Sequence, residues 1–217
     1  MQLDNPDAKL VDVASGTGDV ASRFYKFSRS CGYCPDVTAV DPNEAMLCEG
    51  KKKALNEAVV LNYVQADAQM LPFADNVFDY YTISFGIRNV QDRHMALAEA
   101  YRVLKPGGKM VCLEFSKPVH GAMKALYKLH AAMIPMLGQV VTRNRDAYQY
   151  LIDSIEAFPD QEEFVRQIMD AGFCEVSYRN LTGGVAAIHT GFKKECVENA
   201  GHKREVYRGY GIPKEVR

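Results

Sequence analysis

Lys9-Leu-Val-Asp-Val-Ala-Ser-Gly-Thr-Gly-Asp19 is the stretch of sequence that decides the fold. Residues 9–14 form a short apolar run that stops at Ser-Gly-Thr-Gly, which predicts a buried strand running into a glycine turn. Helical spacing of apolar residues follows at positions 20–27. A strand, a glycine turn and a helix in this order open an α/β sheet, and ligands of such sheets bind beyond the carboxyl ends of the strands.

The rest of the chain extends this unit by alternation. Apolar runs predict strands at 36–40, 59–65, 77–84 and 109–115, and helical spacing predicts helices at 44–57 and 92–104. Strands that alternate with helices pair in parallel through right-handed crossovers, so we expect a doubly wound sheet. After a helix at 161–171, strands at 175–180 and 185–192 are separated by four residues and predict an antiparallel hairpin. A mostly parallel, seven-stranded, Rossmann-like sheet that ends in such a hairpin is typical of class I methyltransferases.

Length and composition set the domain organisation. The chain has 217 residues, 47% of them hydrophobic, which suits one α/β domain over residues 1–193 followed by a charged tail at 194–217. Residues 121–150 fit no strand and are rich in methionine and leucine, so we expect a helix packed on the sheet, a lid over an apolar substrate, or one segment that is both. The net charge of −1, without a basic stripe, argues against nucleic acid as a partner.

The six cysteines are scattered, which is typical of reduced thiols in a reducing compartment. Cys31-Gly-Tyr-Cys34 has the spacing of a redox or zinc motif. Zinc needs two further ligands at matching spacing, and none follows nearby. A redox pair normally opens a helix, whereas this pair precedes Pro35 and a strand. We therefore interpret the pair as structural and predict no metal site.

The glycine turn predicts a small-molecule site. Gly16 and Gly18, with Thr17 between them, allow the backbone to approach a ligand closely. Asp12 lies inside the strand just before the turn, where it can hold an ammonium group indirectly. The third glycine of a dinucleotide motif falls at Ala21, and no P-loop lysine follows, so the turn alone does not identify the ligand.

The tips of the next two strands favour S-adenosylmethionine over NAD. Asp41 ends the second strand 23 residues after Gly18, where an acid can accept hydrogen bonds from both ribose hydroxyls of either cofactor. The third strand leads into Asp67-Ala68-Gln-Met-Leu71-Pro-Phe, which is similar to the adenine-binding pattern of class I methyltransferases. We expect Asp67 and Ala68 to contact the adenine and Leu71 to pack against it. A helix-capping role explains one such acid, but not three at successive strand tips.

Two longer motifs resemble one family closely. Ile83-Ser-Phe-Gly-Ile-Arg-Asn-Val90 and Tyr101-Arg-Val-Leu-Lys-Pro-Gly-Gly-Lys109, which continues to Leu-Glu114-Phe-Ser-Lys-Pro118, are similar to motifs of the UbiE-type C-methyltransferases of ubiquinone and menaquinone biosynthesis. The resemblance covers residues 9–193. It departs at Ser15, where a glycine is usual, and at the start, where the family's N-terminal helical segment is expected before the first strand. We expect that segment to supply substrate contacts.

The resemblance implies methyl transfer from S-adenosylmethionine to a ring carbon of a polyprenylated methoxy-benzoquinol. Ser84 is then expected to line the methionine side of the cofactor. Arg88 is the candidate catalytic residue, stabilising a phenolate and orienting a water that removes the proton, because arginine itself stays protonated. Asn89 is expected to orient the same region. The alternative for Arg88 is a surface or ion-pairing arginine.

Three further residues stay open as participants in proton transfer. His130 and His189 are alternative bases, although a lone histidine is more often structural. Glu114 ends the fifth strand, where it can support Arg88 from behind.

The competing functions are methylation of another apolar substrate, such as demethylmenaquinol or a sterol, and a non-catalytic S-adenosylmethionine-binding scaffold. A polyprenyl substrate implies peripheral membrane contact, and we expect residues 123–137 to face the membrane or a partner subunit. The resemblance further implies partner subunits of a ubiquinone-biosynthesis complex or a homodimer. The expected location is the matrix side of the mitochondrial inner membrane, or the cytoplasm if the source is bacterial.

Overall fold

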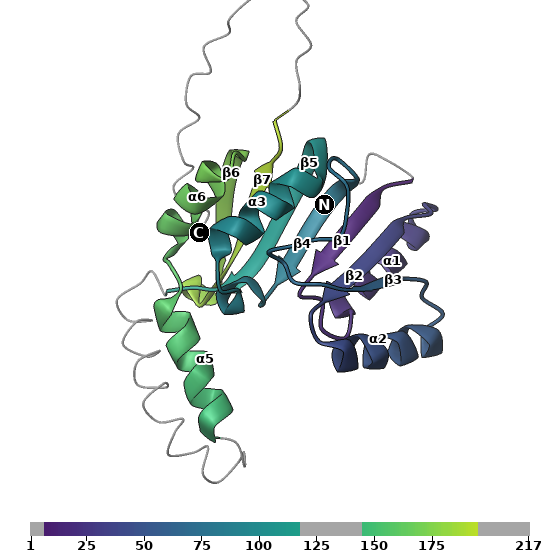
Figure 1. The fold of residues 1–217 in the computed structure, drawn as a ribbon, viewed down its shortest axis with the longest axis horizontal. Helices are drawn as coiled ribbons and strands as arrows, with labels where there is room; N and C mark the ends of the chain where they lie inside the picture. Colours follow the sequence, from purple (N-terminus) through teal and green to yellow (C-terminus); the bar gives the residue numbers. More distant parts are fainter. Residues whose placement is uncertain (1–6, 118–144, 195–217) are drawn as a thin grey trace, which may run out of the picture.

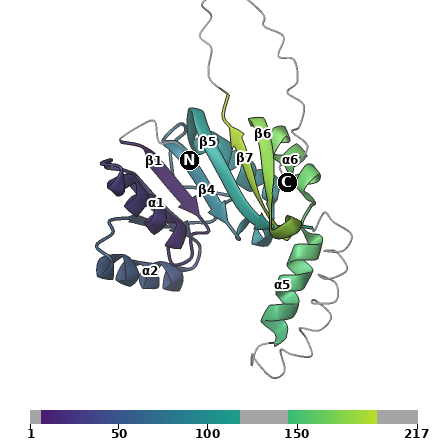
Figure 2. The ribbon, with the colours of Figure 1, turned by 180° about the vertical axis from the view of Figure 1, so that it is seen from behind.

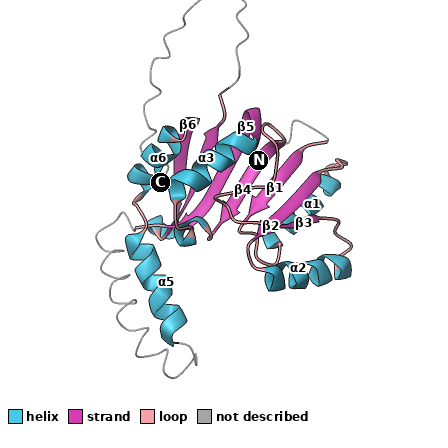
Figure 3. Ribbon diagram, viewed as in Figure 1, coloured by secondary structure: helices cyan, strands magenta, loops and turns pink. Residues whose placement is uncertain are grey.

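The computed structural model describes residues 7–117 and 145–194. Seven strands form a single sheet in the order β3-β2-β1-β4-β5-β7-β6 (Figure 3). The first five pair in parallel, and β7 inserts antiparallel between β5 and β6. Their bounds are β1 Lys9–Val13, β2 Asp36–Asp41, β3 Asn62–Gln65, β4 Phe78–Ser84, β5 Leu104–Phe115, β6 Cys174–Leu181 and β7 Ala186–Phe192. The predicted doubly wound sheet with a C-terminal hairpin is confirmed.

Helices cover both faces of this sheet. They are α1 Asp19–Ser30, α2 Glu44–Asn56, η1 Ile87–Asn89, α3 Arg93–Val103, α5 Arg145–Ala157, α6 Gln161–Asp170 and η2 Thr182–Gly184. Figure 1 shows α3 and α6 in front of the sheet, and the view from behind in Figure 2 shows α1 on the opposite face. In both views α5 extends beyond the edge at which the parallel strands end, and it contacts η1 at that edge.

Strand alternation produces two cores. Val11 and Val13 point to the larger core, under α3 and α6, whereas Leu10 points to a smaller core under α1. Asp12 shares the α1 side with Leu10, because successive side chains of a strand point to opposite faces. A polar residue therefore sits inside the sheet next to the start of α1, where a ligand site at the strand ends can use it.

Some element boundaries differ from the predicted ones. β5 begins at Leu104, not at residue 109, and the Pro106-Gly107-Gly108 segment lies within it as an irregularity in its pairing with β4. β3 begins at Asn62, because residues 58 and 59 finish the α2 turn with Ala58 at φ 52° and the Val59 N–H on the Ala54 carbonyl. The expected lid is described only from α5 onward. The membrane-facing segment at 123–137 and the tail at 195–217 lie outside the described residues.

Candidate active site

The glycine turn after β1 is held by the acid at the end of β2. Gly16 and Gly18 adopt left-handed backbone conformations, with φ values of 55° and 76°, which glycine adopts without steric cost. Asp41 Oδ2 accepts a hydrogen bond from the Gly16 N–H at 2.8 Å, and its Oδ1 accepts one from the Asn43 N–H at 2.8 Å. Asp41 is 8% exposed. The carboxylate thus fixes the turn at the end of β2.

Asp12 is a buried carboxyl group beneath the same turn. Its Oδ1 accepts a hydrogen bond from the Thr82 hydroxyl at 2.6 Å, and a second bond comes from the backbone N–H of Ala21 at the start of α1. Burial raises the pKa of Asp12 to about 7, which exceeds the lowering by these two bonds. A cationic ligand group nearby would favour the ionised form, so the residue suits an ammonium group that needs a counter-charge.

The tip of β3 presents a third acid. Asp67 is exposed, and its Oδ1 accepts hydrogen bonds from the backbone and side-chain amide groups of Gln69 at 2.8 and 2.9 Å. Ala68 is buried, and so is Leu71, whereas Met70 between them is 78% exposed. The structure brings Asp12, Asp41 and Asp67 to the carboxyl ends of adjacent strands, as the sequence analysis expected.

Close packing fixes how the strand ends meet. A Cβ atom added at Gly86, two residues after Ser84, would lie 2.3 Å from the Ala14 Cβ, so only glycine allows β4 to end this close to β1. A Cβ atom added at Gly50 of α2 would lie 2.9 Å from the Thr17 carbonyl oxygen. Glycine is therefore needed on both sides of the turn for its backbone to stay close to β4 and α2.

The residues at this edge fit S-adenosylmethionine. Ser15 Oγ is buried and has no hydrogen-bond partner among the described residues, so the turn holds a polar atom that a ligand can satisfy. Met46, half-exposed, lies 3.4 Å from the position of a Gly16 Cβ and gives the turn an apolar wall. The buried Asp12, the turn-holding Asp41 and the exposed Asp67 are spread over three adjacent strand ends.

The ends of β4 and β5 have a different character. Arg88 lies in η1 and forms an ion pair with Glu114, with Nη1 to Oε1 at 2.8 Å, and the two side chains are 10% and 1% exposed. The other Glu114 oxygen accepts the Arg88 backbone N–H at 3.2 Å. Burial raises the pKa of Glu114, and the Arg88 guanidinium opposes that rise. Arg88 is therefore an ion-pairing arginine, and Glu114 supports it from behind.

Arg88 also contacts two aromatic residues. Its Nη1 donates to the Phe85 carbonyl, and its guanidinium lies 5.2 Å from the centre of the Phe115 ring. Its Nε is buried without a partner among the described residues. The guanidinium is thus fixed by Glu114 and the Phe85 carbonyl, and its Nε is a buried donor that no described residue satisfies.

Helix α5 adds a residue that the sequence analysis missed. The hydroxyl of Tyr150 donates to Asn89 Oδ1 at 3.2 Å, and Tyr150 is 59% exposed. Phe85 and Phe115 were missed as well, since their neighbours in the motif carried more obvious chemistry. The signal was an aromatic residue at the end of a predicted parallel strand, since Phe85 directly follows one strand and Phe115 is the last residue of another.

Of the two alternative bases, His189 does not lie at this edge. His189, in β7, is 1% exposed, packs edge-on against Phe164 and lies 3.3 Å from the Gln161 carbonyl oxygen. Burial lowers its pKa to about 4, so it is a neutral packing residue, and its expectation as a base is wrong. His130 lies outside the described residues.

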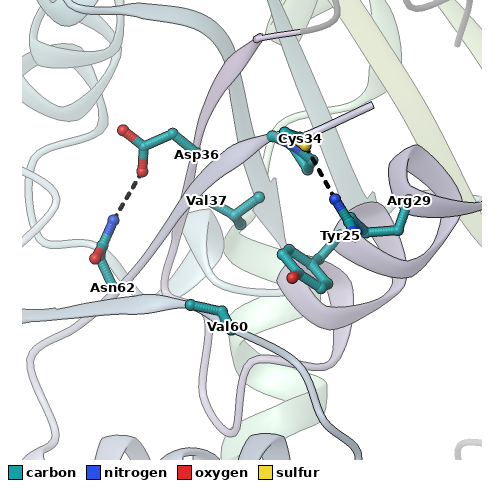
Figure 4. Close-up of a pocket in the computed structure, with 8 residues that line it drawn as sticks. Tyr25, Arg29, Cys34, Asp36, Val37, Val60 and Asn62 are labelled. Atoms are coloured by element: carbon teal, nitrogen blue, oxygen red, sulfur yellow. Dashed lines mark hydrogen bonds between the residues drawn. The ribbon is translucent and has the colours of Figure 1, made fainter. Parts of the chain in front are cut away.

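A cavity of about 360 Å³ opens at the opposite edge, between α1 and the amino ends of β2 and β3 (Figure 4). There Arg29 Nη1 donates to Cys34 Sγ at 2.9 Å, and Asn62 donates to Asp36 at 2.8 Å. Cys31 caps the C-terminus of α1, so the Cys31–Cys34 pair lies in the turn that joins α1 to β2. This edge lies away from the glycine turn and the acids.

The sheet order, the glycine turn and the three strand-tip acids together define a class I S-adenosylmethionine-dependent methyltransferase. The sequence pattern of the ubiE/COQ5 methyltransferase family matches residues 1–193, and the chain belongs to that family. A UbiE ubiquinone/menaquinone biosynthesis C-methyltransferase from Rickettsia felis is 51% identical over 195 residues, which are 88% of this chain and 79% of the relative.

Solved structures agree at the level of the fold. An S-adenosylmethionine-dependent methyltransferase from Aquifex aeolicus has a TM-score of 0.62 at 17% identity, over 86% of this chain and 82% of that one. A phosphoethanolamine N-methyltransferase from Haemonchus contortus, in complex with S-adenosyl-L-methionine, has a TM-score of 0.63 at 15% identity, over 87% of this chain and 49% of that one. No helix among the described residues is long and apolar enough to cross a membrane.

Proposed function

We propose that this enzyme methylates a ring carbon of a polyprenylated methoxy-benzoquinol in ubiquinone biosynthesis. The observation that carries the proposal is Arg88, a buried arginine clamped by Glu114 with its Nε unpartnered among the described residues, at the strand ends next to exposed Phe85. An arginine in that position can hold the oxygen of a phenolic ring. The 51% identity to a UbiE enzyme supports the same class of acceptor.

S-adenosylmethionine supplies an activated methyl group. The chain's own residues therefore have to bind the cofactor and the acceptor, orient them and remove a proton. We assign the methionine end of the cofactor to Asp12, Gly16, Thr17, Gly18 and Ser84. The ribose is assigned to Asp41 and the adenine to Asp67 and Ala68. This path runs along adjacent strand ends and finishes beside β4, where the acceptor residues begin.

Arg88 and Asn89 act on the acceptor. Loss of the hydroxyl proton makes the ring carbons ortho and para to it nucleophilic, so a group that stabilises the phenolate lowers the barrier. The Arg88 guanidinium supplies the positive charge that stabilises that oxygen, while the ion pair with Glu114 keeps the guanidinium in place. Asn89, whose oxygen accepts from Tyr150, orients the ring edge or a water that takes the proton.

The substrate's prenyl tail places the enzyme at a membrane surface. We propose peripheral docking, on the matrix side of the mitochondrial inner membrane for a eukaryotic source and on the cytoplasmic side for a bacterial one. Association with other enzymes of the same route would pass the tailed intermediate between sites. Flotation with liposomes tests the docking, and protein that stays with the soluble fraction argues against it.

A panel of acceptors tests the substrate. With tritiated S-adenosylmethionine, a short-tailed 2-methoxy-6-prenyl-benzoquinol should be methylated faster than a short-tailed demethylmenaquinol, and a sterol should not be methylated. Preference for the naphthoquinol would move the enzyme to the menaquinone route. Tight cofactor binding without turnover on any of the three would favour a non-catalytic scaffold.

A further inference from the structure

Phe85 is an aromatic residue in a position that folding alone does not favour. It follows β4 directly, has a φ of 55° and is 39% exposed. Only glycine adopts such a backbone conformation without cost, and bulky residues in it are found where the surroundings enforce it, often at ligand sites. Its backbone is enforced here, because its N–H donates to the Leu113 carbonyl at 2.8 Å and its carbonyl accepts from Arg88.

The Phe85 ring is supported from one side. Its centroid lies 4.7 Å from that of Phe115, with the two planes inclined at 43°. The Arg88 guanidinium lies 5.2 Å from the Phe115 ring. The two rings and the arginine therefore form one cluster at the ends of β4 and β5, in which Phe85 keeps exposed surface and Arg88 keeps an unpartnered N–H among the described residues.

We propose that Phe85, backed by Phe115, is the surface on which the aromatic ring of the acceptor stacks. Stacked rings prefer offset contact with centroids about 4.5–7 Å apart, so the platform sets the plane of the ring while Arg88 meets its oxygen. Phe85 is thus a positioning and specificity residue that selects a planar ring over a saturated one. The inference rests on the proposed function for the identity of the acceptor.

The test measures ring binding without turnover. In the whole chain saturated with S-adenosylhomocysteine, 2-methoxyhydroquinone and 2-methoxycyclohexanol are titrated as the planar and the saturated probe. Phe85→Leu keeps an apolar side chain at the same strained backbone but removes the π face. It should weaken binding of the planar probe roughly 3- to 10-fold, the fold-change that a stacking contact is worth, and leave the saturated probe unchanged. Phe85→Tyr should bind both probes like wild type.

Phe27→Leu is the matched control, because Phe27 is 52% exposed and lies in α1. It should change neither affinity. The proposal is overturned if Phe85→Leu binds the planar probe like wild type, or if it weakens both probes equally. These outcomes do not depend on methyl transfer, so the platform can fail while the acceptor panel still supports C-methylation, and the reverse.

Discussion

The edge at which the parallel strands end has a cofactor half, at β1 to β3, and an acceptor half, at β4 and β5. Different kinds of side chain line these two halves. At the ends of β1 to β3 the side chains are short acids, and Asp41 bonds backbone N–H groups of the glycine turn directly. At the ends of β4 and β5 the side chains are long or aromatic, and a buried ion pair holds them. In the proposed function, the cofactor contacts a backbone turn held by acids, whereas the acceptor contacts side chains. The comparison teaches that cofactor affinity and acceptor chemistry can be changed separately.

The largest effect is expected from Arg88→Ala. Turnover should fall at least about 100-fold, the usual effect of removing a positioned donor to an oxyanion, while S-adenosylmethionine affinity stays near wild type. Calorimetry and steady-state kinetics on the same preparation measure both. Arg88→Lys should rescue poorly, because a point charge does not reproduce the planar fork.

Loss of stability has to be separated from loss of function here. Arg88→Ala leaves Glu114 buried without its cation, which costs about 3–5 kcal/mol of unfolding free energy. Adding Glu114→Gln should restore much of that stability without restoring turnover. Arg166→Ala, which removes an exposed ion pair with Glu163, is the control and should change neither stability nor turnover. Full turnover in the double variant would remove Arg88 from the mechanism.

Asp41→Ala should weaken cofactor binding without changing the acceptor half. We expect S-adenosylmethionine to bind more weakly by about 2–3 kcal/mol, because a charged acceptor of hydrogen bonds is lost. Asp36 begins the same strand, so Asp36→Ala is the matched control and should bind normally. Calorimetric titration decides the matter, and equal affinity in both variants would take Asp41 out of the cofactor site.

The contact between the halves is tested at Gly86. Gly86→Ala places a Cβ against Ala14, and overpacking of this kind costs about 1–3 kcal/mol of unfolding free energy. Ala14→Gly removes the obstructing Cβ and relieves a φ of 51°, so the double variant should recover the loss. Chemical denaturation measures both. A Gly86→Ala protein as stable as wild type would show that the strand ends can separate freely.

The smallest effect concerns Asp12 and pH. Its pKa is raised to about 7 in the folded state, so its contribution to stability is full below pH 4 and is lost as the pH rises through 7. Without cofactor, the melting temperature of wild type should therefore fall by several degrees more than that of Asp12→Asn between pH 5 and pH 8. Parallel curves for the two proteins would mean that the Asp12 carboxyl is better solvated than its 1% exposure indicates.

The sequence predicted the cofactor half better than the acceptor half. A glycine turn between a buried strand and a helix has few conformations open to it, and an acid at the end of a parallel strand always reaches the same edge. Asp12, Asp41 and Asp67 could therefore be placed from the order of elements alone. The predicted start of a strand at residue 109 was wrong, because pairing of Leu104 with Phe78 of β4 begins β5 five residues earlier.

The acceptor half depends on contacts between residues distant in the sequence. The order of the strands placed Glu114 near Arg88, but nothing near Arg88 in the chain shows that the pair will be buried, or that Tyr150 will reach Asn89. His189 was expected to be a possible base because its burial could not be foreseen. That burial depends on the packing of α6 on β7, which the local sequence does not encode. Such roles become visible only when the elements are assembled.

One measurement tests the central claim most directly. A single turnover with S-adenosylmethionine labelled with ¹³C in its methyl group, in the presence of the short-tailed methoxy-benzoquinol, can be followed by NMR. The account predicts that the label appears as a methyl group on a ring carbon in wild type and remains on the cofactor in Arg88→Ala. A label found on a ring oxygen, or transferred equally by both proteins, would contradict it.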